Sequence, residues 1–96
     1  IRYSFHPDAE ADLKEASRFY ESRMVGLGKS FSAEVERTIS LIREFPDAES
    51  PVGVRRRRVL VDRFPYSVVY RRDPDSVVIV AIAHQRRRPG YWRQRK

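Results

Sequence analysis

Most of the side chains in this 96-residue sequence that could do chemistry are arginines in its second half. Residues 51–96 contain 13 basic and three acidic side chains, whereas residues 1–50 contain seven basic and ten acidic ones. Lysine occurs at three positions only, so 17 of the 20 basic residues are arginine. A guanidinium is a planar fork of donors that fits phosphate or carboxylate. The pattern predicts an anionic partner (nucleic acid, acidic protein or a phosphorylated surface); the alternative is a solvated basic face.

RNA cleavage is one chemistry that these residue types could perform. It needs a base near the 2′-hydroxyl, donors for the charge on phosphate, and an acid for the leaving oxygen. Histidine is the residue type suited to either proton transfer near neutral pH, which makes His84 a candidate, and Tyr91 could donate a proton or stack on a base. The alternative for His84 is a structural role at the end of a strand. The candidate site residues are Arg58, Arg63, His84, Arg86, Arg87 and Tyr91.

Other site chemistries find little support in the sequence. There is no cysteine, the two histidines stand 78 positions apart, and we expect neither a metal nor a cofactor. Paired-carboxylate catalysis is disfavoured in the second half, whose acids are Asp62, Asp73 and Asp75. The longest apolar run, residues 77–83, is too short for a membrane span, and no signal peptide is visible. We therefore expect a cytoplasmic protein that does not enter membranes.

The elements that must position these residues follow from the hydrophobic periods. Alternation predicts strands at residues 1–5, 55–61 and 66–71. Residues 77–83 are apolar throughout, which predicts a strand that is central in the sheet or covered on both faces. Helical spacing predicts helices from Pro7 to about residue 24 and from about residue 29 to 45, separated by Gly26 and Gly28. Residues 46–54 are interpreted as a loop. The order β-α-α-β-β-β predicts a single α+β domain over residues 1–96, with a helix hairpin on one face of a largely antiparallel sheet.

The predicted sheet would bring the basic segments together. In an antiparallel meander the start of one strand lies beside the end of its neighbour, so Arg58 and Arg63 could approach the arginines that follow residue 83. Tyr91 and Trp92 would then form an aromatic rim on which RNA bases could stack. For Trp92 the alternative is a cap on a small core. His6 is interpreted as a helix-start residue.

Two blocks of the sequence resemble the RelE/ParE family of toxins from type II toxin–antitoxin (plasmid stabilisation) modules. Residues 58–70, RVLVDRFPYSVVY, are similar to its Arg…FPY-x-hydrophobic-x-Tyr core. Residues 81–93, AIAHQRRRPGYWR, are similar to its AxxHxRRxPxYW ending. The first half agrees at residues 7–9, Tyr20, residues 26–28 and Phe31. The resemblance implies the family's α+β fold.

The resemblance implies two alternative activities and one partner. RelE-like members cleave mRNA on the ribosome, and ParE-like members poison DNA gyrase without being nucleases. By position, Arg58, Arg63, Arg86, Arg87 and Tyr91 match the RelE-like active residues, with arginine where lysine is common. The basic and aromatic tail suits RNA, so we rank the endoribonuclease first and the gyrase inhibitor second. The implied partner is a cognate antitoxin protein in a hetero-oligomer, whose segments are often acidic.

Overall fold

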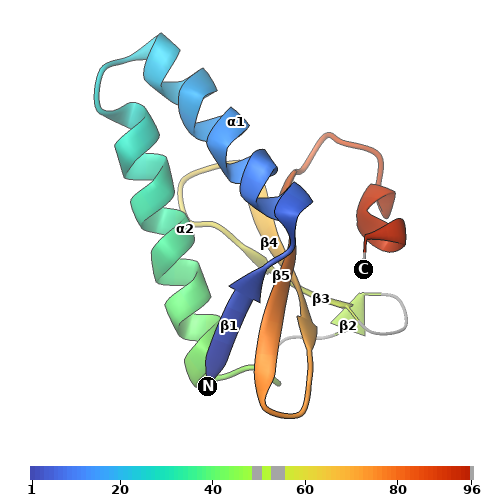
Figure 1. Ribbon diagram of the computed structural model, residues 1–96. Helices are drawn as coiled ribbons and strands as arrows, with labels where there is room; N and C mark the ends of the chain where they lie inside the picture. Colours follow the sequence, from blue (N-terminus) through green and yellow to red (C-terminus); the bar gives the residue numbers. More distant parts are fainter. Residues whose placement is uncertain (49–50, 53–55, 96) are drawn as a thin grey trace.

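The protein is an α+β domain with one mixed sheet and a helix hairpin, as the sequence predicted (Figure 1). The computed structural model describes residues 1–48, 51–52 and 56–95. The strand order is β1-β5-β4-β3-β2; β1 is parallel to β5, and the other pairs are antiparallel. The elements are β1 (Arg2–Phe5), α1 (Pro7–Arg23), α2 (Leu27–Glu44), β2 (Pro51–Val52), β3 (Arg56–Leu60), β4 (Tyr66–Arg72), β5 (Ser76–His84) and a 3₁₀ helix, η1 (Tyr91–Gln94).

The predicted boundaries need three adjustments. The expected loop over residues 46–54 contains β2, which pairs with the start of β3. The second helix begins at Leu27, so Gly28 lies inside it instead of interrupting it. The strand expected over residues 55–61 is described as Arg56–Leu60, and Arg55 lies outside the described residues. His6 caps α1 as predicted, because its side chain accepts a hydrogen bond from the Asp8 amide.

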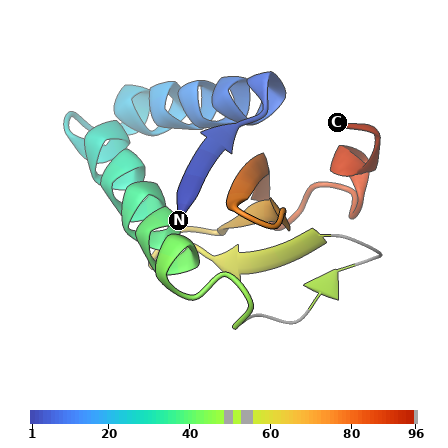
Figure 2. The ribbon, with the colours of Figure 1, turned by 60° about the horizontal axis from the view of Figure 1, so that its bottom comes forward.

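Strand β5 is central in the sheet and buried on both faces, as its continuous apolar run predicted. Its Val77, Ile79 and Ile82 pack with the helices in the main core. On the opposite face, Val80 and Ala81 pack with the tail. Two successive residues face the same side because the register with β4 shifts between Val69 and Tyr70, which leaves Val80 as the extra residue of a bulge. Figure 2 shows the helices and the tail on opposite sides of β4 and β5.

The helix hairpin covers one face of the sheet with apolar side chains of both helices. Ala9 and Ala16 of α1 and Phe31 of α2 are buried, together with Val35, Ile39 and Ile42. The rings of Tyr20, Phe31, Phe64 and Tyr66 pack together, with centroids about 5–6 Å apart. Met24 and Phe45 continue the apolar spacing of the two helices, but they are 60% and 55% exposed because each lies just past the end of its helix.

The turn between the helices depends on two glycines and one carboxylate. Gly26 has a φ of 89°, in the left-handed region that glycine adopts without steric cost. Gly28 lies against α1, where an added Cβ would come within 2.4 Å of the Ser17 carbonyl oxygen. The Glu21 carboxylate accepts hydrogen bonds from the amides of Gly26 and Gly28, at 2.9 and 3.0 Å. A side chain of α1 thus satisfies amides in the first turn of α2 and fixes the two helices together.

Gly28→Ala is expected to destabilise the domain by about 2 kcal/mol, because the new methyl group would meet backbone instead of a movable side chain. Helix propensity alone predicts the opposite sign, a gain of about 1 kcal/mol. Urea unfolding followed by circular dichroism measures the change. Ser40→Ala, on the exposed face of α2, is the matched control and should leave the midpoint nearly unchanged. A Gly28→Ala variant more stable than the parent would contradict the close helix contact.

Candidate functional site

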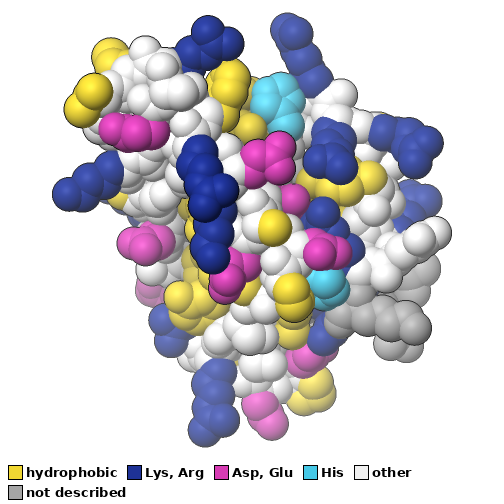
Figure 3. Space-filling model, turned by 45° about the horizontal axis from the view of Figure 1, so that its top comes forward, with side chains coloured by type: hydrophobic (Ala, Val, Ile, Leu, Met, Phe, Trp, Pro, Cys, Tyr) yellow, Lys and Arg dark blue, Asp and Glu magenta, His cyan; other side chains and the backbone are white. Residues whose placement is uncertain are grey.

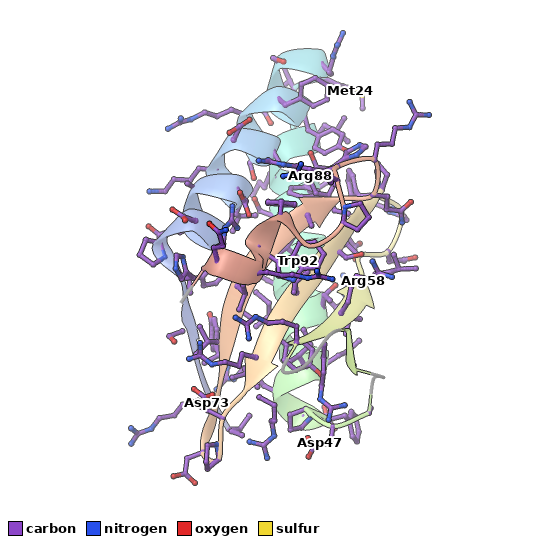
Figure 4. The ribbon with its side chains drawn as sticks, turned by 90° about the vertical axis from the view of Figure 1, so that its right-hand side faces the viewer. Met24, Asp47, Arg58, Asp73, Arg88 and Trp92 are labelled. Carbon is purple, nitrogen blue, oxygen red and sulfur yellow. The ribbon has the colours of Figure 1, made fainter. Side chains whose placement is uncertain are left out.

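Three of the predicted site residues line one cavity on the sheet face away from the helices. Arg58 reaches it from β3, His84 from the end of β5 and Arg87 from the loop that follows. The cavity has a volume of about 260 Å³. In Figure 4, Arg58 and Trp92 lie side by side on this face, and Arg88 lies above them on the loop. The remaining lining residues are Leu60, Ser67, Ala83, Gln85, Pro89 and Trp92. Two guanidinium groups and one imidazole suit this cavity to an anion.

A second cavity, of about 190 Å³, lies between the tail and α1. His84 and Arg87 line it as well as the first cavity, and Tyr91 joins them here. Asp12 and Glu15 bring carboxylates to it from α1, which the sequence analysis did not connect with the site. Only the fold could reveal them, because they stand about 70 residues before His84 in the sequence. These acids make the second cavity less favourable for a phosphate than the first.

The other two predicted site residues, Arg63 and Arg86, line neither of these cavities. Arg63 lies in the turn between β3 and β4, with a φ of 67°, and its Nη2 is 4.0 Å from Glu34 Oε2 on α2. It therefore faces the helices, whereas Arg58 faces the tail. The Arg86 side chain is exposed. The expected approach of Arg58 to the tail arginines is present, but Arg63 does not take part in it.

The surroundings of His84 limit its proton chemistry. Its Nδ1 accepts a hydrogen bond from the Arg86 backbone amide at 3.0 Å, and its ring packs edge-on against Tyr66. In a neutral imidazole with Nδ1 as acceptor, the proton lies on Nε2. In this arrangement His84 fixes the loop and presents a donor, so the structural role described for it in the sequence analysis is present in the structure.

The aromatic residues of the tail are covered and do not form an open rim. Arg87 lies over the Tyr91 ring at 4.0 Å from its centroid, and Arg95 lies at 5.1 Å. Burial raises the pKa of the Tyr91 phenol, and the charge of Asp12 raises it further, so Tyr91 stays protonated at neutral pH. Trp92 is 5% exposed and packs with Val80 and Ala81, as a cap on the smaller core.

An ion pair with α1 fixes the tail in place. The Arg95 Nη1 atom is 2.7 Å from Asp12 Oδ2, and both side chains are only 13% exposed. The pairing of β1 with β5 ends at Phe5, and past that point the Asp12–Arg95 ion pair covers the edge of β5. Asp12 accepts from the Ile82 amide at 3.1 Å, and Arg95 donates to the Val80 carbonyl at 3.0 Å. Side chains thus take the place of a strand, and they hold Tyr91 and Arg87 beside the cavities.

These features define a small α+β domain with an arginine-lined cavity held in place by its C-terminal tail. The sequence profile described as "ParE toxin of type II toxin-antitoxin system, parDE" matches residues 3–89. The chain therefore belongs to the ParE toxin family of type II toxin–antitoxin systems, which confirms the RelE/ParE resemblance.

The fold is also that of a solved relative, described as "Chromosomal ParDE TA system from P. aeruginosa". The two chains superpose with a TM-score of 0.72, over 88% of this chain and 95% of that chain, at 20% sequence identity. No curated protein sequence matches significantly. Within the described residues, no helix is long and apolar enough to cross a membrane, and no three His, Cys, Asp or Glu side chains gather as metal ligands.

Arg95→Ala is expected to lower the free energy of unfolding by about 3 kcal/mol, because it leaves the Asp12 carboxylate buried without its cation. Urea unfolding measures this loss. In addition, trypsin should cut the released tail faster than in the parent protein. The exposed residue Arg93 supplies the control, and Arg93→Ala should change stability by less than about 0.5 kcal/mol.

A double-mutant cycle tests whether Asp12 is the partner responsible. Asp12→Ala combined with Arg95→Ala should cost clearly less than the sum of the two single losses, because the second change removes an already unpaired group. Strict additivity would show that the two side chains do not stabilise the tail together.

Proposed function

We propose that this chain is a toxin that arrests growth by inhibiting DNA gyrase without cleaving nucleic acid, and that a cognate antitoxin protein neutralises it. The family assignment supports a toxin of a type II module. The ParE branch of the wider family is the one that the resemblance associates with gyrase. This proposal reverses the order in which the sequence analysis ranked the two activities.

The observation that carries the choice is that all six predicted site residues present hydrogen-bond donors in the arrangement that the structure gives them. Four are arginines, which stay protonated and do not act as bases. Tyr91 keeps its proton because burial raises its pKa. His84 has its Nδ1 occupied and presents Nε2–H. Such a set can hold an anion, but attack by a 2′-hydroxyl also needs a group that accepts its proton.

Cleavage of mRNA remains the second candidate, and Glu15 is a residue that could accept the proton in it. Its carboxylate is exposed and lines the cavity shared by His84, Arg87 and Tyr91. A scissile phosphate placed there would lie near both Glu15 and Asp12, whose charges repel it. A nuclease would therefore depend on Glu15 or His84, whereas a gyrase inhibitor would not.

His84→Gln and Glu15→Gln are expected to remain toxic, because neither group is needed for inhibition of gyrase. Each variant and the parent are expressed under tight induction, and incorporation of labelled thymidine and of labelled amino acid is followed over the first minutes. We expect DNA synthesis to fall first while translation continues. Purified protein should inhibit supercoiling by gyrase, and co-expression of the cognate antitoxin should restore growth.

An early fall in translation, together with new mRNA 5′ ends that disappear in folded His84→Gln or Glu15→Gln, would contradict the proposal and establish the nuclease. Circular dichroism confirms that each variant is folded. Leu41→Ala, on the exposed face of α2 and outside both cavities, is the control for expression and purification of a variant.

A further inference from the structure

We propose that five arginines around the tail form a binding surface for the phosphate backbone of double-stranded DNA. This arginine surface consists of Arg58 on β3, Arg86, Arg87 and Arg88 in the loop after β5, and Arg93 in η1. The inference rests on the proposed function, because a gyrase at work holds duplex DNA. It adds that the toxin contacts that DNA itself.

The arginines of the second half fall into two groups. Those at one end of the sheet have carboxylate partners. Arg57 and Arg72 lie 3.9 and 3.4 Å from Asp47, and Arg71 donates to Asp73 at 2.9 Å. Arg95 is paired with Asp12, as described above. Figure 4 shows Asp47 and Asp73 at the end of the molecule opposite Arg88. These arginines are used within the fold.

The arginine surface differs in this respect. Among residues 1–48, 51–52 and 56–95, no carboxylate oxygen lies within 4.0 Å of a guanidinium nitrogen of Arg58, Arg86, Arg87, Arg88 or Arg93. All five side chains are exposed. Arg58 and Arg87 line one cavity, and Arg86, Arg88 and Arg93 belong to the same loop and to η1. Like charges gathered in this way repel each other, and an external anion relieves that repulsion. Figure 3 shows blue Lys and Arg side chains gathered on the upper right of the molecule.

The covered aromatic rings favour a duplex over a single strand. Proteins that bind single strands stack the bases on exposed ring faces. Here Arg87 covers Tyr91, and Trp92 is 5% exposed. A duplex keeps its bases stacked inside and presents its phosphates. Guanidinium groups can bind those phosphates without an exposed aromatic ring on which bases would stack.

The position of exposed apolar side chains favours DNA over an acidic peptide. Segments that fold on binding need apolar anchors as well as charge. The large exposed apolar side chains of the described residues lie mostly on β1, the helices and their ends: Ile1, Tyr3, Phe19, Met24, Val25, Leu41 and Phe45. Leu60 is the exception beside the arginine surface. A peptide would therefore find its apolar contacts on β1 and the helices, away from the arginine surface, whereas phosphates need no apolar contacts.

The test measures binding of the 96-residue chain to a fluorescently labelled 20-base-pair duplex of arbitrary sequence, without gyrase, by fluorescence anisotropy. Each phosphate that an arginine neutralises adds about 0.9 to the slope of log affinity against log salt concentration, so five give a slope of about −4.5. We expect binding at low salt with a slope between about −3 and −5. The single strand of the same sequence should bind more weakly.

The decisive variant is Arg86→Gln combined with Arg88→Gln, since both side chains are exposed and neither contributes to the core. It should reduce the slope by about two and weaken binding at 0.1 M salt about tenfold or more. Arg18→Gln combined with Arg23→Gln removes the same charge from α1 and is the matched control, expected to change binding about twofold at most. Circular dichroism checks that both variants are folded.

Three results would overturn the proposal: no binding to duplex at low salt, an equal loss in the control pair, or tighter binding to polyglutamate or the single strand than to the duplex. Supercoiling assays with the same variants keep the two proposals apart. If the chain inhibits gyrase but does not bind duplex DNA, the DNA-binding surface is contradicted and the proposed function stands. If the chain binds duplex DNA but does not inhibit gyrase, the DNA-binding surface stands and the proposed gyrase target is contradicted.

Discussion

Burial of β5 on both faces is the constraint on which the remainder of the structure depends. A strand whose side chains are apolar on either side must be covered twice. The helix hairpin covers one face, with Phe31 and Ile39 in the main core. On the other face the tail returns across the strand and places Trp92 against Val80 and Ala81. The loop between β5 and η1 is thereby held over the sheet, and the arginines in it become a fixed surface.

The same fold separates two uses of arginine. In one, the guanidinium completes the structure: Arg95 takes the place of a missing strand along β5, and Arg71 and Arg72 pair with acids at the far end of the sheet. In the other, the guanidinium is exposed beside a cavity and has no carboxylate partner among the described residues. Net charge alone does not distinguish these uses. A high positive charge implies an external partner only for the arginines that the fold leaves unpaired.

Local patterns predicted the elements well and their tertiary relations less well. The two periods located the helices and strands, and the apolar run of residues 77–83 predicted the central strand. The pairing of Arg95 with Asp12 was beyond such reasoning, because it joins residues 83 positions apart whose only shared signal is opposite charge. Arg63 was grouped with Arg58 because the pairing of strands in an antiparallel meander was expected to bring both toward the tail. The turn between them directs one to the helices and the other to the tail.

The pairing of the two ends of the chain also bears on how the molecule is made. Among the described residues, strand β1 pairs with β5 alone, at Ser76–Ile79, so β1 cannot join the sheet until β5 has been synthesised. Likewise, Asp12 cannot form its hydrogen bond with Arg95 until Arg95 has been synthesised. Such non-local contacts close late, because the intervening chain must be ordered first. While the chain is still emerging during translation, the helix hairpin can form, but the sheet and the tail that presents the arginines cannot. The proposed arginine surface can therefore form only after η1 has been synthesised, and a protein that recognises the helix hairpin would have access to the chain before that point.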